Sequence, residues 1–211
     1  MTNLSPLHKI PLVIATYNQG KFREISQFLR EVCVLSLPLD RVGPIEVPPE
    51  SGESFQENAE IKAVAVARAC RRLSLADDSG LEVDALGGAP GVHSARFGGP
   101  KATDADRNRM ILERLKEIPT AQRTARFRAV VAVAEPEGCT RFAEGVCEGR
   151  ITEAPRGTQG FGYDPIFEIP SLGKTFAELE PEVKNRLSHR GKAMAGVVAI
   201  LREILEGGAS E

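Results

Sequence analysis

The segment PLVIATYNQGKFREISQFL (residues 11–29) predicts a buried strand, a polar loop and a helix in immediate succession. The apolar run at residues 11–15 has the length and composition of a buried strand. Apolar side chains then recur at helical spacing at Phe22, Ile25, Phe28 and Leu29. A strand that leads through a loop into a helix is typical of α/β proteins.

The next part of the chain predicts a second helix and a second strand. Residues 35–53 are rich in Pro and Gly, so they predict an irregular, exposed connection. Residues 54–57 (SFQE) have the capping-box pattern, which predicts an Ala-rich helix from there to about Arg72. Residues 73–76 predict a short strand, and residues 77–80 (DDSG) predict a turn after it.

Helices and strands continue in the second half. Thr103 is expected to cap a helix, and residues 126–134 and 140–149 predict two long strands joined by a turn. A last helix is expected to start near Ser188. Neither a repeat nor a linker interrupts the pattern. The sequence therefore predicts one domain over residues 1–211, with an α/β fold in which helices flank a mixed β-sheet.

The composition is that of an ordinary globular protein, with 42% apolar and 27% charged residues and a net charge of -2. Without an overall positive field, we expect no nucleic-acid partner. A signal-peptide pattern is missing, and no apolar run approaches the roughly 20 residues that span a bilayer. We therefore expect a cytoplasmic protein without a membrane segment. Its cysteines lack C-x-x-C spacing and are expected to be buried, reduced thiols. They are Cys33, Cys70, Cys139 and Cys147.

The segment TYNQGK (residues 16–21), between the first predicted strand and helix, is a candidate phosphate site. N–H groups at a helix start attract anions, Gly20 permits close approach, and Lys21 supplies a positive charge. The P-loop pattern G-x-x-x-x-G-K-[ST] is absent. An ordinary strand-to-helix turn with a surface lysine explains the same residues equally well.

Asp77 and Asp78 are adjacent carboxylates that directly follow a predicted strand, where the sites of α/β proteins tend to lie. Such a pair suits Mg²⁺, and a third carboxylate could come from Glu50, Glu53 or Glu57. The metal would neutralise substrate phosphates, and one Asp would take the proton from an attacking water. The alternative is an Asx-turn in which the carboxylates cap local N–H groups.

Two later segments bring aromatic and charged residues together. GFGYD (residues 160–164) places Phe161 and Tyr163 in a loop, although only 5% of the chain is aromatic. Their rings could stack on a base or anchor the loop in the core. KNRLSHR (residues 184–190) places three cations and a histidine at the start of the last predicted helix. The helix dipole disfavours cations there unless they meet an anion or a ligand carbonyl; a solvated turn is the alternative.

Taken together, these segments closely resemble the inosine triphosphate pyrophosphatase family. The resemblance extends over nearly the whole chain and implies an elongated, two-lobed α/β fold with a central substrate cleft, usually as a homodimer. It implies Mg²⁺-dependent hydrolysis of ITP, dITP and XTP to monophosphate and pyrophosphate. The matching stretches are IATYNQGK (14–21), ENAEIKA (57–63), ADDSGLEVDALGGAPGVHSARFGG (76–99), GFGYDPIF (160–167) and VKNRLSHRGKA (183–193).

The resemblance also implies roles for single residues. Asp78 resembles the general base and Mg²⁺ ligand, with Ser79 beside it on the substrate, and Phe161 resembles the ring that stacks on the purine. Many relatives carry a metal-binding Glu where this chain has Pro49, so the neighbouring Glu50 is the candidate second ligand. The implied substrate-binding residues are Thr16, Tyr17, Asn18, Gln19, Gly20, Lys21, Ser79, Phe161, Gly162, Tyr163, Asp164, Lys184, His189 and Arg190.

Discrimination against adenine follows from the purine 6-position, whereas rejection of guanine, which also carries a keto group there, must come from the 2-position. Hypoxanthine and xanthine carry a keto acceptor there, which donors such as His189 and Arg190 would bind, whereas adenine carries an amino group that would oppose them. One alternative is the septum-formation-inhibitor type of nucleotide pyrophosphatase, but its early motif has Ser, Pro and Arg residues in place of TYNQGK. Another is a nucleotide- or RNA-binding module, which adjacent carboxylates disfavour because they repel phosphate unless a cation intervenes.

Overall fold

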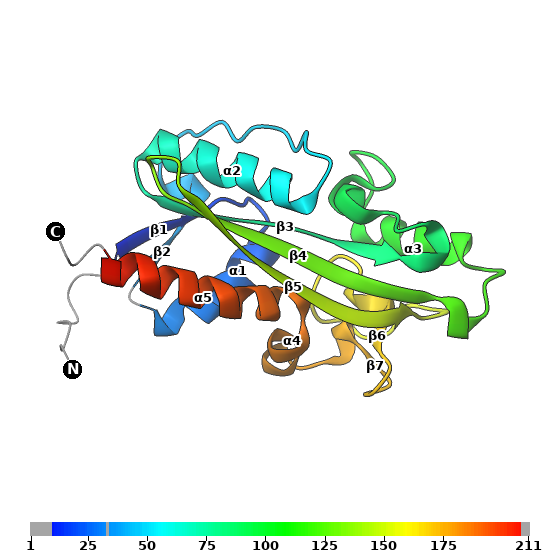
Figure 1. The fold of residues 1–211 in the computed structure, drawn as a ribbon. Helices are drawn as coiled ribbons and strands as arrows, with labels where there is room; N and C mark the ends of the chain where they lie inside the picture. Colours follow the sequence, from blue (N-terminus) through cyan, green and yellow to red (C-terminus); the bar gives the residue numbers. More distant parts are fainter. Residues whose placement is uncertain (1–9, 33, 208–211) are drawn as a thin grey trace. The chain divides into compact units, whose positions relative to one another are not determined.

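The structure, a computed structural model, describes residues 10–32 and 34–207 (Figure 1). Its strands are β1 (Ile10–Ile14), β2 (Val34–Pro38), β3 (Leu73–Val83), β4 (Thr124–Ala134), β5 (Thr140–Ile151), β6 (Phe167–Ile169) and β7 (Lys174–Thr175). Its α-helices are α1 (Gln19–Phe28), α2 (Phe55–Cys70), α3 (Asp104–Arg114), α4 (Pro181–Leu187) and α5 (His189–Gly207). The strand order is β2-β1-β3-β4-β5-β6-β7. Since β1 pairs in parallel with β2 and β3, and β6 antiparallel with β5 and β7, the sheet is mixed and the predicted α/β class is confirmed.

The chain forms two compact units. The first unit comprises the described residues up to Asp78, Val130–Ala143 and those from Met194 onward. The second unit comprises Ser79–Ala129 and Glu144–Ala193. The boundary on β3 falls between Asp78 and Ser79, so these two neighbours in the chain belong to different units.

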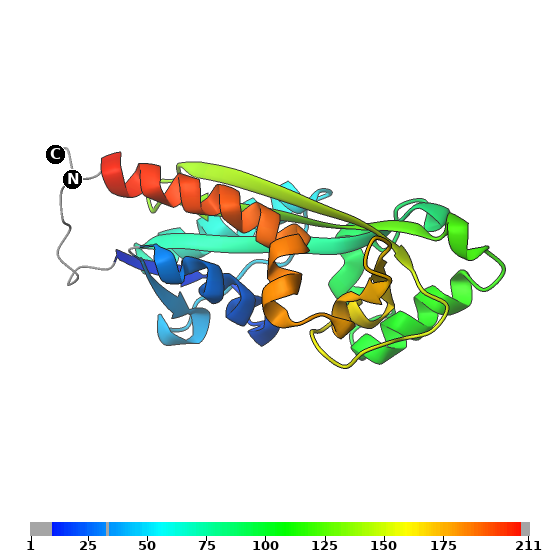
Figure 2. The same cartoon turned by 90° about the horizontal axis from the view of Figure 1, so that it is seen from below.

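In the first unit, α1 and α2 cover opposite faces of the sheet (Figures 1 and 2). The face of α2 that packs on the sheet consists of Ala59, Ala63, Val66 and Ala67, all fully buried and at positions i, i+4, i+7 and i+8 of a helical stripe. They share a core cluster with Val13 of β1. These small side chains explain how the Ala-rich helix predicted from the capping box approaches the sheet closely.

In the second unit, aromatic rings form the centre of the core. The ring centroid of Phe127 on β4 lies 4.6 Å from that of Phe167 and 5.7 Å from that of Phe176. Helix α3 contributes the fully buried Ile111 to the same cluster, and Leu115 follows directly after the helix. Ile111 therefore lies on the buried face of the helix that Thr103 is expected to cap.

Local signals at helix starts and along the long strands are confirmed. The Ser54 hydroxyl accepts from the Glu57 N–H while the Glu57 carboxylate accepts from the Ser54 N–H, which completes the predicted capping box. Thr103 caps α3 in the same way, with Asp106 as its partner. Strands β4 and β5 contain the two predicted runs.

Two local predictions are wrong, both because a distant strand supplies hydrogen bonds. The predicted irregular connection contains β2, whose residues pair in parallel with β1. The predicted turn at residues 77–80 is instead part of the continuous strand β3, which extends to Val83. The chain turns only afterwards, where Gly87 and Gly88 adopt φ values of 64° and 86°.

The prediction that residues 184–190 lie at the start of the last helix is wrong for its first part. Lys184 and Arg186 lie in the last turn of α4, where the helix dipole favours cations. Only His189 and Arg190 lie in the first turn of α5, which begins at His189. A short helix ending at Leu187 thus separates cations that the sequence placed together.

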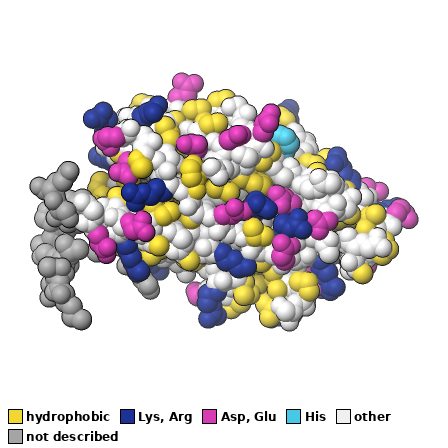
Figure 3. All heavy atoms as spheres, in the orientation of Figure 1, with side chains coloured by type: hydrophobic (Ala, Val, Ile, Leu, Met, Phe, Trp, Pro, Cys, Tyr) yellow, Lys and Arg dark blue, Asp and Glu magenta, His cyan; other side chains and the backbone are white. Residues whose placement is uncertain are grey.

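The surface shows interspersed acidic and basic side chains on the face in Figure 3, as a net charge of -2 predicts. Among residues 10–32 and 34–207, no helix is long and apolar enough to cross a membrane. Cys147 is a buried free thiol, as predicted, but Cys70 is half-buried and Cys139 is exposed, so the prediction of buried thiols is wrong for these two. Cys33 lies outside the described residues.

Candidate functional site

Strand β3 carries two carboxylates that are each paired with a lysine. Successive strand residues point to opposite faces of a sheet, and helices α1 and α2 lie on those two faces. From α1, the Lys21 ammonium lies 2.7 Å from a carboxylate oxygen of Asp77. From α2, the Lys62 ammonium lies 2.9 Å from Oδ1 of Asp78. The strand conformation that replaced the predicted turn is therefore what gives each carboxylate its own cation.

Lys62 connects three acceptors. Its Nζ lies 2.7 Å from Glu50 and 2.9 Å from Asp78, and it donates to the backbone oxygen of Asp77 at 3.1 Å. Glu50 lies in a segment held against α2, where Gly52 donates its N–H to the Asn58 side chain at 2.8 Å. We call Lys21, Glu50, Lys62, Asp77 and Asp78 the carboxylate–lysine cluster; all its members belong to the first unit.

Sequence reasoning assigned no role to Lys62, although a signal was present. Lys62 lies between Ala59 and Ala63 on α2 and is 8% exposed, whereas a lysine on an apolar helix face needs a buried anion. Its position in that face predicts a carboxylate partner. The spacing alone does not say that the partners are Glu50 and Asp78.

The cluster shifts the pKa values of its members. Burial raises the pKa of Asp78 to about 6, against the opposing attraction of the Lys62 and Lys21 ammonium groups. Burial also acts to raise the pKa of Glu50, but Lys62 outweighs it and the pKa of Glu50 is lowered. For Lys62, burial is outweighed by Asp78 and Glu50, so its pKa is raised. The pKa of Asp78 thus lies closer to neutrality than that of Glu50, as a general base requires.

The residues present fit a divalent cation that is held by only one or two protein side chains. Oδ2 of Asp78 is buried and accepts no hydrogen bond from the described part of the chain. Glu50 shares the same lysine, so two carboxylates converge on one point. Within residues 10–32 and 34–207, no three His, Cys, Asp or Glu side chains gather as metal ligands. Mg²⁺ is commonly held by one or two carboxylates, with phosphates and water completing its shell, and the donor set of Glu50 and Asp78 fits that pattern.

The candidate phosphate segment at the start of α1 is held by its own side chains. Thr16 Oγ1 accepts from the Asn18 N–H at 3.1 Å, and the Asn18 side chain caps α1 by accepting from the Lys21 N–H at 3.0 Å. Tyr17 is 65% exposed. Gln19 and Gly20 form the first turn of α1. Their backbone N–H groups and the Lys21 ammonium are the anion-attracting groups of this segment.

The second unit gathers the predicted base-binding residues around Phe161. Lys184 Nζ lies 4.9 Å from the centroid of the half-buried Phe161 ring, and the Arg190 guanidinium lies 5.6 Å from it. Arg190 also donates to the Ser79 hydroxyl at 2.8 Å. The Asp164 carboxylate lies 2.6 Å from the Lys184 ammonium and accepts from the Phe161 N–H at 2.8 Å. These contacts fix a flat aromatic surface among cations, which is suited to stacking a base.

Two further predicted residues have largely buried rings. Tyr163 is 5% exposed and donates its hydroxyl to the backbone oxygen of Ser94 at 2.9 Å, so its ring anchors the loop, one of the two alternatives for this segment. Burial raises the pKa of Tyr163. The ring of His189 stacks on Phe127 with centroids 4.6 Å apart. Gly162, also in the predicted set, is bonded to α3 through its backbone.

The predicted site residues therefore fall into two groups, one in each unit. Asp78 of the first group is followed directly in the chain by Ser79 of the second. One group offers cations and carboxylates on an α/β sheet; the other offers an aromatic ring with cationic neighbours. Together they define the class of this chain as an α/β nucleotide-binding protein with the groups needed for phosphate chemistry.

The chain belongs to the Ham1 family, whose family model matches residues 12–200. This match confirms the resemblance drawn from the sequence motifs. Relatives named dITP/XTP pyrophosphatase come from Geobacillus kaustophilus (50% identical; 93% of this chain, 96% of the relative) and Thermus thermophilus (48% identical; 93% and 94%). Another comes from Desulforamulus reducens (47% identical; 92% and 96%).

Solved structures agree with this assignment. A HAM1 protein from Coxiella burnetii is 41% identical, with a TM-score of 0.84 over 92% of this chain and 99% of its own. A nucleoside-triphosphatase, dITP/XTP pyrophosphatase, from Mycobacterium abscessus is also 41% identical, with a TM-score of 0.73 over 89% of this chain and 98% of its own. The mixed sheet with flanking helices is therefore the fold of the family.

Proposed function

We propose that this chain hydrolyses non-standard purine nucleoside triphosphates (ITP, dITP and XTP) to the monophosphate and pyrophosphate, and so removes them from the nucleotide pool. The observation that carries the proposal is the carboxylate–lysine cluster, in which two ammonium groups accompany two consecutive buried carboxylates. A buried ion pair is weak evidence for a stabilising role because desolvation offsets its attraction. The names of the relatives supply the substrate class.

The lysines of the cluster would bind the triphosphate of the substrate. Lys21, with the first-turn N–H groups of α1 and the side chains of Thr16 and Asn18, would bind phosphate oxygens. Lys62 would add a second ammonium against the charge that develops on the departing pyrophosphate. Neither lysine reads the base, so both would act alike on every nucleoside triphosphate.

The carboxylates of the cluster account for the chemistry. Asp78 and Glu50 would hold Mg²⁺, which neutralises phosphate charge when it is bound. Asp78 would take a proton from the attacking water. The oxygen of that water would form a bond to the α-phosphorus as the bond from this phosphorus to the oxygen that bridges it to the β-phosphate breaks. The electron pair of the broken bond leaves with pyrophosphate. A pKa of about 6 keeps Asp78 largely ionised at neutral pH and lets it release that proton to solvent afterwards.

The residues around Phe161 account for the base. The ring would stack on the purine whatever its substituents, and His189 and Arg190 would donate to the 6-keto oxygen. Lys184 and Asp164 support the ring and its loop, as their 2.6 Å ion pair and the Asp164 bond to the Phe161 N–H indicate. Ser79 would contact the substrate and hold the Arg190 guanidinium.

We also propose that the chain is a homodimer that acts in the cytoplasm, where nucleoside triphosphates are made and used, without binding nucleic acid. It would fold as one domain, because β3, β4 and β5 each supply residues to both units. Light scattering after size-exclusion chromatography tests the dimer. A monomer would rule it out.

The test of the activity compares ITP, dITP, XTP, GTP and ATP in the presence of Mg²⁺, with pyrophosphate and orthophosphate measured separately. We expect pyrophosphate from the first three at rates well above those from GTP and ATP, and loss of turnover with EDTA that Mg²⁺ restores. Orthophosphate as the product, or equal rates on all five nucleotides, would contradict the proposal.

A further inference from the structure

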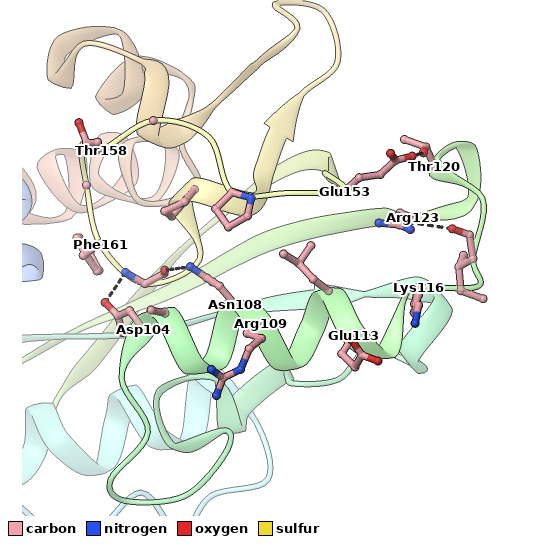
Figure 4. Close-up of a pocket in the computed structure, with 18 of the residues that line it drawn as sticks. Asp104, Asn108, Arg109, Glu113, Lys116, Thr120, Arg123, Glu153, Thr158 and Phe161 are labelled. Carbon is pink, nitrogen blue, oxygen red and sulfur yellow. Dashed lines mark hydrogen bonds between the residues drawn. The ribbon is translucent and has the colours of Figure 1, made fainter.

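The loop that carries Phe161 is bonded to α3 at the next residue, Gly162, through the side chains of Asp104 and Asn108, which Figure 4 labels. The Asp104 carboxylate accepts from the Gly162 N–H at 2.7 Å, and Asn108 Nδ2 donates to the Gly162 carbonyl at 3.1 Å. All these residues belong to the second unit. Both backbone polar groups of a single residue are therefore held by one helix. We call Asp104 and Asn108 the α3 clamp.

The capping box of helix α3 consists of Thr103 and Asp106, and Asp104 lies outside it. One carboxylate oxygen of Asp104 pairs with Arg107 of the same helix at 3.0 Å, and the other accepts from the Gly162 N–H. Positions four residues apart share one helix face, so Asp104 and Asn108 project together toward the loop. Asn108 is 4% exposed, and its side-chain amide is committed to the Gly162 carbonyl. The clamp thus serves the loop.

The rest of the loop is fastened on the other side of Phe161. Asp164 accepts from the Phe161 N–H at 2.8 Å, and Gly160 adopts a φ of 78° at a place where any Cβ would collide with that carboxylate. Thr158 and Gln159 donate their N–H groups to the Ala177 carbonyl at 3.2 and 3.1 Å. With the α3 clamp at Gly162, the backbone is held on both sides of the ring.

Packing does not replace these hydrogen bonds. A cavity of about 990 Å³ lies beside the loop, between it and α3, and Asp104, Asn108, Phe161 and Gly162 are among its lining residues. Residues 153–160 of the loop are exposed. The cavity leaves space beside the loop tip, so the clamp at Gly162 adds to the contacts of Lys184 and Arg190 in holding the Phe161 ring.

We propose that Asp104 and Asn108 are positioning residues for purine binding, which hold Gly162 so that the adjoining Phe161 ring is presented for stacking. This inference rests on the proposed function for the identity of its ligand. Neither residue needs to touch the nucleotide. Because stacking is equally strong before and during the reaction, loss of the clamp raises KM and leaves kcat almost unchanged. Because stacking tolerates any purine, ITP and XTP are affected alike.

Asp104→Ala is the main variant, since its side chain is 53% exposed and its loss leaves the core intact. We expect KM for ITP to rise about tenfold, the effect of losing a charged hydrogen bond that holds the ring. Asp104→Asn keeps an acceptor for the Gly162 N–H and should restore most of the affinity. Asn108→Asp keeps the shape of the side chain but replaces the donor, and should raise KM as well.

The matched control is Asp106→Ala. It also removes a carboxylate from the first turn of α3 and breaks the capping box, but it has no bond to the loop in the structure. It should lower the melting temperature more than Asp104→Ala does and leave KM unchanged. If Asp106→Ala raised KM as much as Asp104→Ala, general weakening of α3 would explain both and the clamp would be refuted.

A readout without substrate is the exchange rate of the Gly162 amide proton, followed by NMR. We expect the rate to rise at least tenfold in Asp104→Ala and to return toward the wild-type value in Asp104→Asn. An unchanged rate, or a fall in kcat at constant KM, would overturn the inference. If the wild-type protein released no pyrophosphate from ITP, the proposed function would fail, whereas faster exchange in Asp104→Ala would still support the clamp.

Discussion

Asp78→Asn should make the metal-free protein more stable at neutral pH while it destroys activity. The pKa of Asp78 is about 6, compared with 3.8 for an unperturbed Asp. A raised pKa means that the protonated form stabilises the fold below pH 4 and that this stability is lost as pH rises through about 6. Asn is neutral at every pH and avoids that loss.

The size of the effect follows from the same pKa values. One pKa unit corresponds to about 1.4 kcal/mol, so ionised Asp78 costs the folded state on the order of 3 kcal/mol above pH 7. In a chain of 211 residues, removing this cost by Asp78→Asn should raise the melting temperature at pH 8 by roughly 5–10 °C. Near pH 4 the two proteins should be equally stable. Saturating Mg²⁺ should reduce this difference in melting temperature at pH 8, because the metal binds the Asp78 carboxylate of the wild type and not the amide of the variant.

The assay is denaturant unfolding in EDTA between pH 4 and pH 8, followed by far-UV circular dichroism because the chain contains no Trp. Asp106→Asn is a control of opposite sign: hydrogen bonds from Thr103 lower the pKa of the exposed Asp106, so this variant should be less stable than wild type by a nearly constant amount from pH 5 to pH 8. Pyrophosphate release by Asp78→Asn should fall about a hundred- to ten-thousand-fold. An Asp78→Asn protein less stable than wild type at pH 8 would show that Lys62 outweighs burial, and near-normal turnover would remove Asp78 from the mechanism.

Other substitutions separate the phosphate, catalytic and base groups. Lys21→Ala should raise KM for all triphosphates by similar factors, and it should lower the melting temperature because the Asp77 carboxylate loses its ammonium partner. Adding Asp77→Asn should restore the melting temperature but not KM. A rise in KM that is confined to ITP would contradict this role of Lys21. Lys62→Met should lower kcat by at least tenfold, as pyrophosphate release under saturating ITP will show; unchanged kcat would exclude Lys62 from catalysis. Arg190→Ala should reduce kcat/KM for ITP about ten- to a hundredfold and so reduce the ratio of kcat/KM for ITP to that for ATP. Phe161→Ala should lower kcat/KM for both nucleotides by similar factors. The reverse pattern would exchange the roles of the two residues.

The sequence by itself determined the elements whose signals are local. The β1–loop–α1 unit, the capping boxes at Ser54 and Thr103 and the long strands β4 and β5 depend on periodicity and caps within a few residues. The motifs around Asp78 and Phe161 likewise carried the family resemblance, which the match over residues 12–200 confirms.

Only the tertiary structure decided which residues meet. Asp77 and Asp78 look like a turn, but they lie within the continuous strand β3 of the sheet, where each carboxylate pairs with a lysine from a different helix. Lys62 gains its role from Glu50 and Asp78, 12 and 16 residues away. The bond between Asp104 and Gly162 spans 58 residues. Local composition carries no information about such partners, because their approach depends on how the whole chain buries its apolar faces and satisfies the charges carried in with them.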